Sequence, residues 1–131
     1  MDDGSRAGSI LIIEDDEDIR SFAARVLELE GYHVLQAADG KEGLRMLRQN
    51  HASLVLLDLR LPDCDGWAVL EELRTDSELS SIPVAMFTAA AALSKRNQAL
   101  ATGVADYLVK PLSAASLKET VDRLLCRRGR R

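Results

Sequence analysis

One segment restricts the possible folds of this chain more than any other: four consecutive apolar residues that end at an acidic one, Leu54-Val55-Leu56-Leu57-Asp58. Apolar side chains on both faces of a strand indicate that both faces are buried, which is typical of a parallel sheet covered by helices. Pro62 and Gly66 then predict a loop. Asp58 is therefore expected where a buried strand ends, at the edge where open α/β sheets bind their ligands.

Other strands and helices alternate around this segment. The expected strands are Ile10–Ile13, Tyr32–Ala37, 54–58, Pro83–Phe87 and Asp106–Val109. Helical spacing of apolar residues predicts five helices. In four of these helices the inward residues are Ile19, Phe22, Ala23, Val26 and Leu27; Leu44 and Leu47; Val69, Leu70 and Leu73; and Leu117, Val121 and Leu124. The other helix has a weaker pattern and is expected from about Ser94 to Thr102. Alternating strands and helices predict an α/β fold, a parallel sheet wound with helices on both faces.

Length and composition favour one domain. The chain has 131 residues, a net charge of −4 and 47% hydrophobic residues. We expect a flexible lead at 1–8, the domain at 9–126 and a basic tail at 127–131. A net negative charge argues against a surface that binds nucleic acid over its whole area. The basic tail is interpreted as solvated, with a contact to nucleic acid or to a partner as the alternative.

Cellular location is inferred from what the sequence contains. Cys64 and Cys126 lack the spacing of metal ligands and fit free thiols in a reducing cytosol. The first residues are polar and acidic, unlike a secretory signal. The longest mainly apolar run, 82–93, contains Pro83 and is shorter than the roughly 20 residues of a membrane helix. We expect a cytoplasmic protein.

Polar residues follow four of the predicted strands: Glu14 and Asp15, Asp58, Thr88, and Lys110. Because the carboxyl ends of parallel strands meet at one edge, these side chains are expected together. Three carboxylates repel one another unless a cation is present, and oxygen ligands suit Mg²⁺. Lys110 adds a positive charge and Thr88 a hydroxyl donor. The set predicts a site for a phosphoryl group, whose transfer depends on positioning and charge neutralisation.

A family resemblance rests on motifs that occur in order along the chain. These motifs are Ile12-Ile13-Glu14-Asp15-Asp16, Leu56-Leu57-Asp58-Leu59-Arg60-Leu61-Pro62, Asp65-Gly66, Phe87-Thr88-Ala89 and Lys110-Pro111. From Ser9 to about Leu125 the chain resembles the receiver domains of response regulators in two-component signalling. The resemblance implies a flavodoxin-like, CheY-like fold with strand order 2-1-3-4-5.

The resemblance also implies a reaction and its metal. Asp58 would accept a phosphoryl group from a histidine kinase or a histidine phosphotransfer protein. Asp15 would bind Mg²⁺ directly, Glu14 mainly through metal-bound water, and Arg60 through its backbone carbonyl. Arg20, at the offset usual in the family, fixes this alignment and leaves Asp16 outside the site.

Other residues would sense the phosphoryl group. Thr88 would hydrogen-bond its oxygens and Lys110 would pair with them, and the Lys110–Pro111 peptide is a candidate for the cis form. Tyr107 matches the family's aromatic switch position, although it could simply be a packed strand aromatic. Phosphorylation would then alter the face of helix 4, strand 5 and helix 5, at about 94–125, which would bind a downstream target or a second copy.

Several alternatives remain open at this stage. The domain is not expected to be an enzyme, apart from catalysing its own phosphorylation and dephosphorylation. It could be a stand-alone regulator or a receiver cut from a larger hybrid kinase or regulator. A haloacid-dehalogenase-like phosphotransferase also uses an aspartate after a buried strand, but it typically has a second Asp where this chain has Arg60. No direct contact with nucleic acid or membrane is expected.

Overall fold

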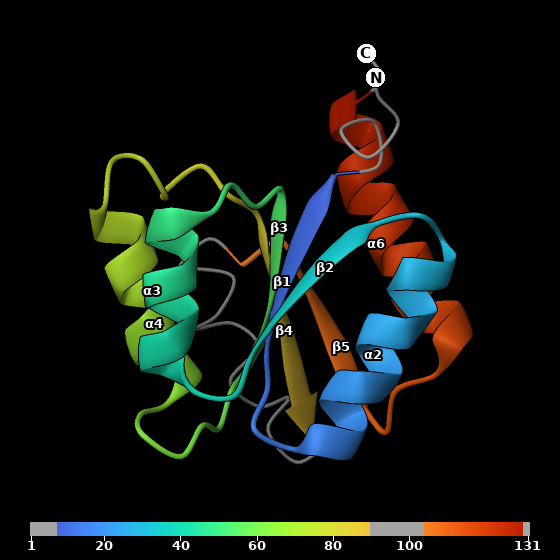
Figure 1. Cartoon of the computed structure of the whole chain (residues 1–131), viewed down its shortest axis with the longest axis horizontal. Helices are drawn as coiled ribbons and strands as arrows, with labels where there is room; N and C mark the ends of the chain where they lie inside the picture. Colours follow the sequence, from blue (N-terminus) through green and yellow to red (C-terminus); the bar gives the residue numbers. More distant parts are fainter. Residues whose placement is uncertain (1–7, 90–103, 130–131) are drawn as a thin grey trace.

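All five expected strands form one parallel sheet in the order β2-β1-β3-β4-β5 (Figure 1). The structure, a computed structural model, describes residues 8–89 and 104–129. Its elements are β1 (Ser9–Ile13), α2 (Glu17–Leu29), β2 (His33–Ala37), α3 (Gly40–Gln49), β3 (Leu54–Asp58), α4 (Gly66–Thr75), β4 (Val84–Ala89), β5 (Asp106–Lys110) and α6 (Ala114–Gly129). The predicted fold class and strand order are confirmed.

Helices cover both faces of the sheet, α3 and α4 one face and α2 and α6 the other (Figure 1). Each face has its own apolar core, because successive side chains of a strand point to opposite faces. In β1 and β3, the residues that face α3 and α4 are Leu11, Ile13, Val55 and Leu57, and those that face α2 and α6 are Ile10, Ile12, Leu54 and Leu56. All eight are fully buried. This two-sided burial explains the uninterrupted apolar runs in the sequence.

The buried face of α2 differs from the predicted one. Phe22, predicted to face inward, is 42% exposed, whereas Ala24, not predicted to be inward, is 3% exposed. Ala23 and Leu27 are buried as expected. The face is rotated toward Ala24 because α2 packs against Leu117 and Val121 of α6 as well as against the sheet.

Aspartates begin the helices that follow the first three strands. The side chains of Asp16, Asp39 and Asp65 accept hydrogen bonds from backbone N–H groups in the first turns of α2, α3 and α4. Such caps satisfy N–H groups that have no partner within the helix. Asp16 therefore caps α2.

The outer parts of the chain add three observations. The predicted helix at about 94–102 lies outside the described residues. Helix α6 extends to Gly129, so it includes the first residues of the predicted basic tail. Of the helices that the structure describes, none combines the length and the apolar character needed to cross a bilayer.

Candidate functional site

Three carboxylates meet at the carboxyl edge of the sheet. Ile13 pairs with Leu57 across β1 and β3, so the next residues, Glu14 and Asp58, lie side by side. Single carboxylate oxygens of Glu14, Asp15 and Asp58 lie within 4.8 Å of one another. Glu14 is fully buried and Asp58 is 3% exposed, whereas Asp15 is exposed. The strand register therefore brings together the three acids that the sequence predicted as a cluster.

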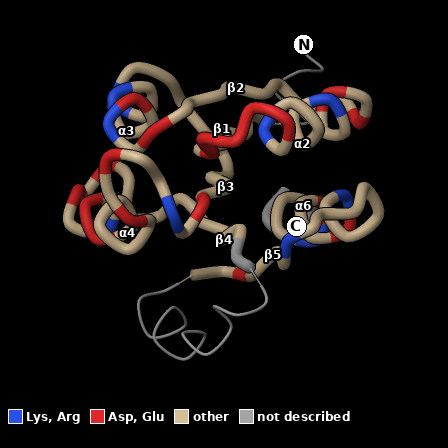
Figure 2. Tube along the Cα trace, turned by 90° about the horizontal axis from the view of Figure 1, so that it is seen from below, with Lys and Arg blue, Asp and Glu red and all other residues tan. Residues whose placement is uncertain are grey.

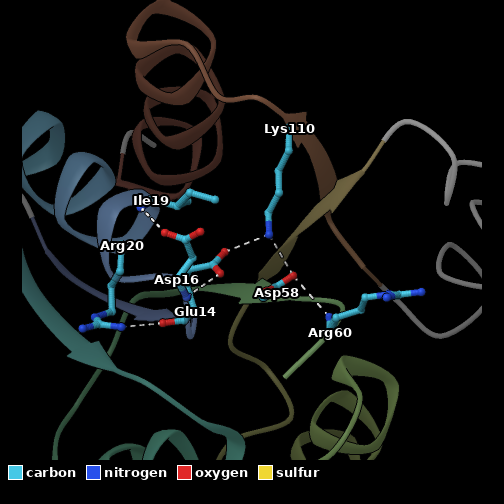
Figure 3. Close-up of polar contacts among 7 residues, drawn as sticks. All are labelled: Glu14, Asp16, Ile19, Arg20, Asp58, Arg60 and Lys110. Atoms are coloured by element: carbon cyan, nitrogen blue, oxygen red, sulfur yellow. Dashed lines mark hydrogen bonds and ion pairs between the residues drawn. The ribbon is translucent and has the colours of Figure 1, made fainter. Parts of the chain in front are cut away.

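Lys110 reaches this cluster from the other side of β4 (Figure 3). Its Nζ atom lies 3.1 Å from Oε1 of Glu14 and 3.2 Å from Oδ1 of Asp58. Only a long side chain at the end of β5 can span the intervening strand. The peptide bond between Lys110 and Pro111 is cis, as the family resemblance implied.

Burial and charge act against each other in this cluster. Burial raises the pKa of Glu14 to about 7, and the negative charge of Asp58 adds to this, although a hydrogen bond from the backbone N–H of Asp16 opposes the shift. Burial would lower the pKa of Lys110, but hydrogen bonding and charge from Glu14 and Asp58 together raise it. The pocket thus favours a full positive charge on Lys110 and resists a further negative charge.

Acidic residues gather at this edge, at the end of β3 and in the segments that follow β1 and β3 (Figure 2). The donor set fits a hard divalent cation, because carboxylate oxygens are the ligands that Mg²⁺ takes in proteins, usually from one or two side chains with water completing the shell. Glu14, Asp15 and Asp58 would hold such an ion. A cation bound between these side chains would favour the charged forms of Glu14 and Asp58, which burial and mutual repulsion oppose.

The loop between β3 and α4 orients Asp58. The backbone N–H of Arg60 donates to Oδ1 of Asp58 at 3.2 Å, while the Arg60 side chain points away from the carboxylates (Figure 3). Gly66 closes the loop by donating its N–H to the carbonyl of Leu59 at 2.7 Å. A β-carbon on Gly66 would lie 2.5 Å from the carbonyl oxygen of Asp58, so only glycine allows this approach.

The remaining predicted residues lie around the cluster. Arg20 donates from Nη1 to the carbonyl of Glu14 at 2.8 Å and so fixes the backbone there. Thr88 pairs with Val109 near the end of β4, while its side chain lies outside the described part of the chain. Tyr107 is half-buried and packs against the core on the α3 and α4 face. Arg20 is thus tied to the backbone of the cluster, while Thr88 and Tyr107 belong to β4 and β5.

One loop residue that the sequence did not single out also contacts a neighbouring element. Asp63 accepts hydrogen bonds from the backbone N–H groups of Gly40 and Lys41 at the start of α3. Its partners are more than twenty positions earlier in the chain, so no local pattern indicates the contact. The predicted topology alone could have indicated that the two segments are neighbours, because it places the start of α3 and this loop at the same edge of the sheet.

Comparison with known proteins decides the family. A family model described as the response regulator receiver domain matches residues 10–122. The chain belongs to the response-regulator receiver family. This confirms the resemblance seen in the sequence.

Relatives of this receiver domain occur in different settings. The chain is 40% identical over 121 residues to the DNA-binding dual master transcriptional regulator RpaA of a Synechocystis strain, covering 92% of this chain and 50% of RpaA. The chemotaxis response regulator CheY4 of Vibrio cholerae superposes with a TM-score of 0.83 at 28% identity, covering 88% of this chain and 97% of CheY4.

A third relative is the signal receiver domain of a histidine kinase from Syntrophus aciditrophicus. It superposes with a TM-score of 0.85 at 30% identity, covering 95% of this chain and 94% of that domain. The receiver thus spans about half the length of the curated relatives it matches and nearly all of these solved structures.

Proposed function

We propose that this receiver domain accepts a phosphoryl group on Asp58 from a phosphohistidine of a histidine kinase or a histidine phosphotransfer protein. The observation that carries the proposal is the buried Asp58 carboxylate, with Lys110 Nζ at 3.2 Å and Glu14 and Asp15 beside it. A carboxylate is a weak nucleophile, so the site's contribution is positioning and charge neutralisation.

The proposed step exchanges one bond to phosphorus for another. A carboxylate oxygen of Asp58 attacks the phosphorus atom, and the bond between phosphorus and the donor imidazole nitrogen breaks. The electron pair of that bond stays on the imidazole nitrogen, which takes up a proton, and Asp58 becomes an acyl phosphate. Hydrolysis of the acyl phosphate by water would return Asp58 to a carboxylate, so the domain would act catalytically only on its own phosphorylation state.

Charge neutralisation determines which residues take part. Lys110 already contacts Asp58 and would pair with the phosphoryl oxygens, and Thr88 would donate a hydrogen bond to them. Glu14, Asp15 and Asp58, together with the backbone carbonyl of Arg60, would hold Mg²⁺. The ion, when bound, supplies positive charge that offsets the repulsion between an anionic donor and an anionic acceptor.

The added charge would be transmitted along β5. A phosphoryl group brings close to two negative charges, and these would draw Lys110 away from its shared position between Glu14 and Asp58. Tyr107 lies three residues earlier in the same strand and would change its packing as the proposed switch. Asp106 begins the strand and pairs with Arg123 of α6 at 2.6 Å. The face that includes β5 and α6 would bind a downstream protein or a second copy of the domain.

Labelling with a small phosphodonor tests the proposal. In the presence of Mg²⁺, intact mass should increase by one phosphoryl group, and Asp58→Asn should abolish the increase. Asp16→Asn is the matched control, because Asp16 belongs to the same acidic run but caps α2, so labelling should persist. Unchanged labelling of Asp58→Asn would contradict the assignment, and repeated turnover of a small phosphomonoester would favour a phosphotransferase instead.

A further inference from the structure

The loop that follows Asp58 is attached to the start of α3 by one carboxylate. Asp63 accepts a hydrogen bond on Oδ1 from the N–H of Gly40 at 2.9 Å and one on Oδ2 from the N–H of Lys41 at 3.0 Å. These two donors lower the pKa of Asp63, because they stabilise its ionised form. Both carboxylate oxygens are thus used for a contact between two loops of the carboxyl edge.

The first turn of α3 receives its acceptors from two different sources. Asp39, the residue before the helix, accepts from the N–H of Glu42 at 2.8 Å, which is an ordinary cap within one segment. The two preceding N–H groups, of Gly40 and Lys41, are instead satisfied by Asp63 from the loop after β3. Without Asp63 these donors would depend on water.

Close packing supports the same attachment. A β-carbon built on Gly40 would lie 2.6 Å from Sγ of Cys64 and 2.9 Å from Cγ2 of Val69. The loop therefore lies directly against the start of α3, and no side chain fits between them. Inside the loop, the N–H of Leu61 donates to the carbonyl of Cys64 at 3.1 Å, which ties Asp63 and Cys64 to the part of the loop nearest Asp58.

The same loop contacts the proposed phosphorylation site. Arg60, three residues before Asp63, donates its backbone N–H to Oδ1 of Asp58 at 3.2 Å. The backbone of Arg60 also forms an isolated antiparallel β-bridge with the backbone of Asp65. A loop released from α3 at Asp63 is free to move Arg60, and with it the hydrogen bond that orients Asp58. One loop thus contains both the contact of Asp63 with α3 and the hydrogen bond of Arg60 to Asp58.

We propose that Asp63 is a positioning residue for Asp58, holding the β3–α4 loop against the N-terminus of α3 so that the backbone of Arg60 keeps the acceptor carboxylate oriented. The inference rests on the proposed function of Asp58. A purely structural role would be that of a helix cap, for which Asp63 and Asp39 would be equivalent. A positioning role makes Asp63 alone matter for the chemistry.

A matched pair of variants separates the two roles. Asp63→Ala and Asp39→Ala each remove one carboxylate from the start of α3, and both should lower the melting temperature to a similar extent. Only Asp63→Ala should speed amide hydrogen exchange at Arg60, Leu61 and Gly66. Only Asp63→Ala should slow labelling of Asp58 by a small phosphodonor, by about tenfold if one hydrogen bond to a charged group, worth about 1.4 kcal/mol, is lost.

A second set of variants tests the contact without removing the carboxylate. Gly40→Ala should push the loop away through the collision with Cys64 and reproduce the effects of Asp63→Ala. Adding Cys64→Ala should restore labelling in part, because the nearest colliding atom is then absent. Asp63→Asn, which keeps one acceptor oxygen, should give intermediate exchange and labelling rates.

The outcomes separate this inference from the proposed function. Equal exchange and labelling rates in Asp63→Ala and Asp39→Ala would overturn the positioning role, as would a loosened loop with an unchanged labelling rate. If the unaltered domain is not labelled on Asp58, the proposed function fails. Mg²⁺ affinity, followed through the fluorescence of Trp67, the single tryptophan, then decides the positioning role: it should be weaker in Asp63→Ala, and an unchanged affinity would overturn it.

Discussion

At the scale of single residues, the central relationship is that of Lys110 with two carboxylates that repel each other. Glu14 is buried beside Asp58, and one ammonium group lies within 3.2 Å of both. Burial, with the negative charge of Asp58 added to it, raises the pKa of Glu14 to about 7, so Glu14 retains its proton at mildly acidic pH. Below about pH 7 the cluster therefore carries less than its formal negative charge.

This imbalance predicts how stability depends on pH in the absence of divalent cations. Between about pH 4.5 and 7 the folded state keeps the proton of Glu14 and the unfolded state releases it. The free energy of unfolding should therefore fall as pH rises across this range, by at most about 3 kcal/mol, and then level off. Urea unfolding in EDTA at pH 5 and pH 8 measures the change.

Glu14→Gln provides the reference for that measurement, because glutamine has nearly the same shape and does not titrate. The difference in stability between the unaltered domain and the variant should shrink or reverse as pH rises, and Mg²⁺ should restore stability to the unaltered domain more at pH 8 than at pH 5. A stability difference that is the same at both pH values would contradict the raised pKa.

The sequence predicts the members of this cluster better than their environments. Glu14, Asp58 and Lys110 each follow an apolar strand, so their common edge is predictable from topology. That Glu14 is fully buried while Asp15 is exposed, and that Lys110 reaches Glu14 from three strands away, are properties of the tertiary structure. The contacts of Asp63 were likewise not predictable from the local sequence, because its partners lie at the start of α3, after a different strand.

At the scale of elements, the junction between β3 and α4 is a very tight backbone approach beside the site. On Gly66, a β-carbon would lie 2.5 Å from the carbonyl oxygen of Asp58 and 2.9 Å from the α-carbon of Leu59. Both are backbone atoms, so no side-chain rotation can relieve the collision. The start of α4 and the end of β3 must separate if the glycine is replaced.

Gly66→Ala should consequently destabilise the domain by roughly 1–3 kcal/mol, as overpacking typically does, and should also slow labelling of Asp58. Gly31→Ala is a suitable comparison. Gly31 has a φ of 97°, which strains alanine, but a β-carbon there would meet nothing within 4 Å, and the residue precedes β2 at the opposite edge. A similar loss of stability with normal labelling is expected there; equal labelling in both variants would contradict the argument.

Elements were predictable to different degrees. The strands could be predicted from their apolar runs, because a strand buried on both faces needs no decision about which of its residues point inward. The predicted inward face of α2 was wrong at Phe22 and Ala24, since periodicity gives the width of an apolar stripe but not which part of it packs against a second helix. In α2, contact with α6 favours the small side chains of Ala23 and Ala24.

At the scale of the whole molecule, β5 links the cluster at one edge of the sheet to a contact with α6. Lys110 ends β5, and Asp106 at its start pairs with Arg123. Beryllofluoride, which mimics the phosphoryl group, should shift the amide NMR signals of β5 and α6 as well as those near Asp58, because Lys110 must follow the new charge.

The Asp58→Asn variant serves as the control for this experiment, since it should show no shifts on addition of beryllofluoride. Signal changes in the unaltered domain confined to the surroundings of Asp58 would count against transmission through β5. The common edge of the acidic residues and Lys110 follows from sheet topology, so it could be predicted, whereas the ion pair between Asp106 and Arg123 was not predicted. The partner that binds this face could not be predicted, because surface recognition leaves no periodic pattern in the sequence.

The aspartate caps have a consequence for the electric field at this edge. Parallel strands bring the starts of α2, α3 and α4 to the same edge, and each helix start carries a partial positive charge. Asp16, Asp39 and Asp65, together with Asp63, are paired with those helix starts, which act as built-in counter-ions. The electrostatic potential at this edge is thus less negative than the number of acidic residues suggests. An approaching anion such as a phosphorylated donor would therefore be repelled mainly by the small cluster around Lys110.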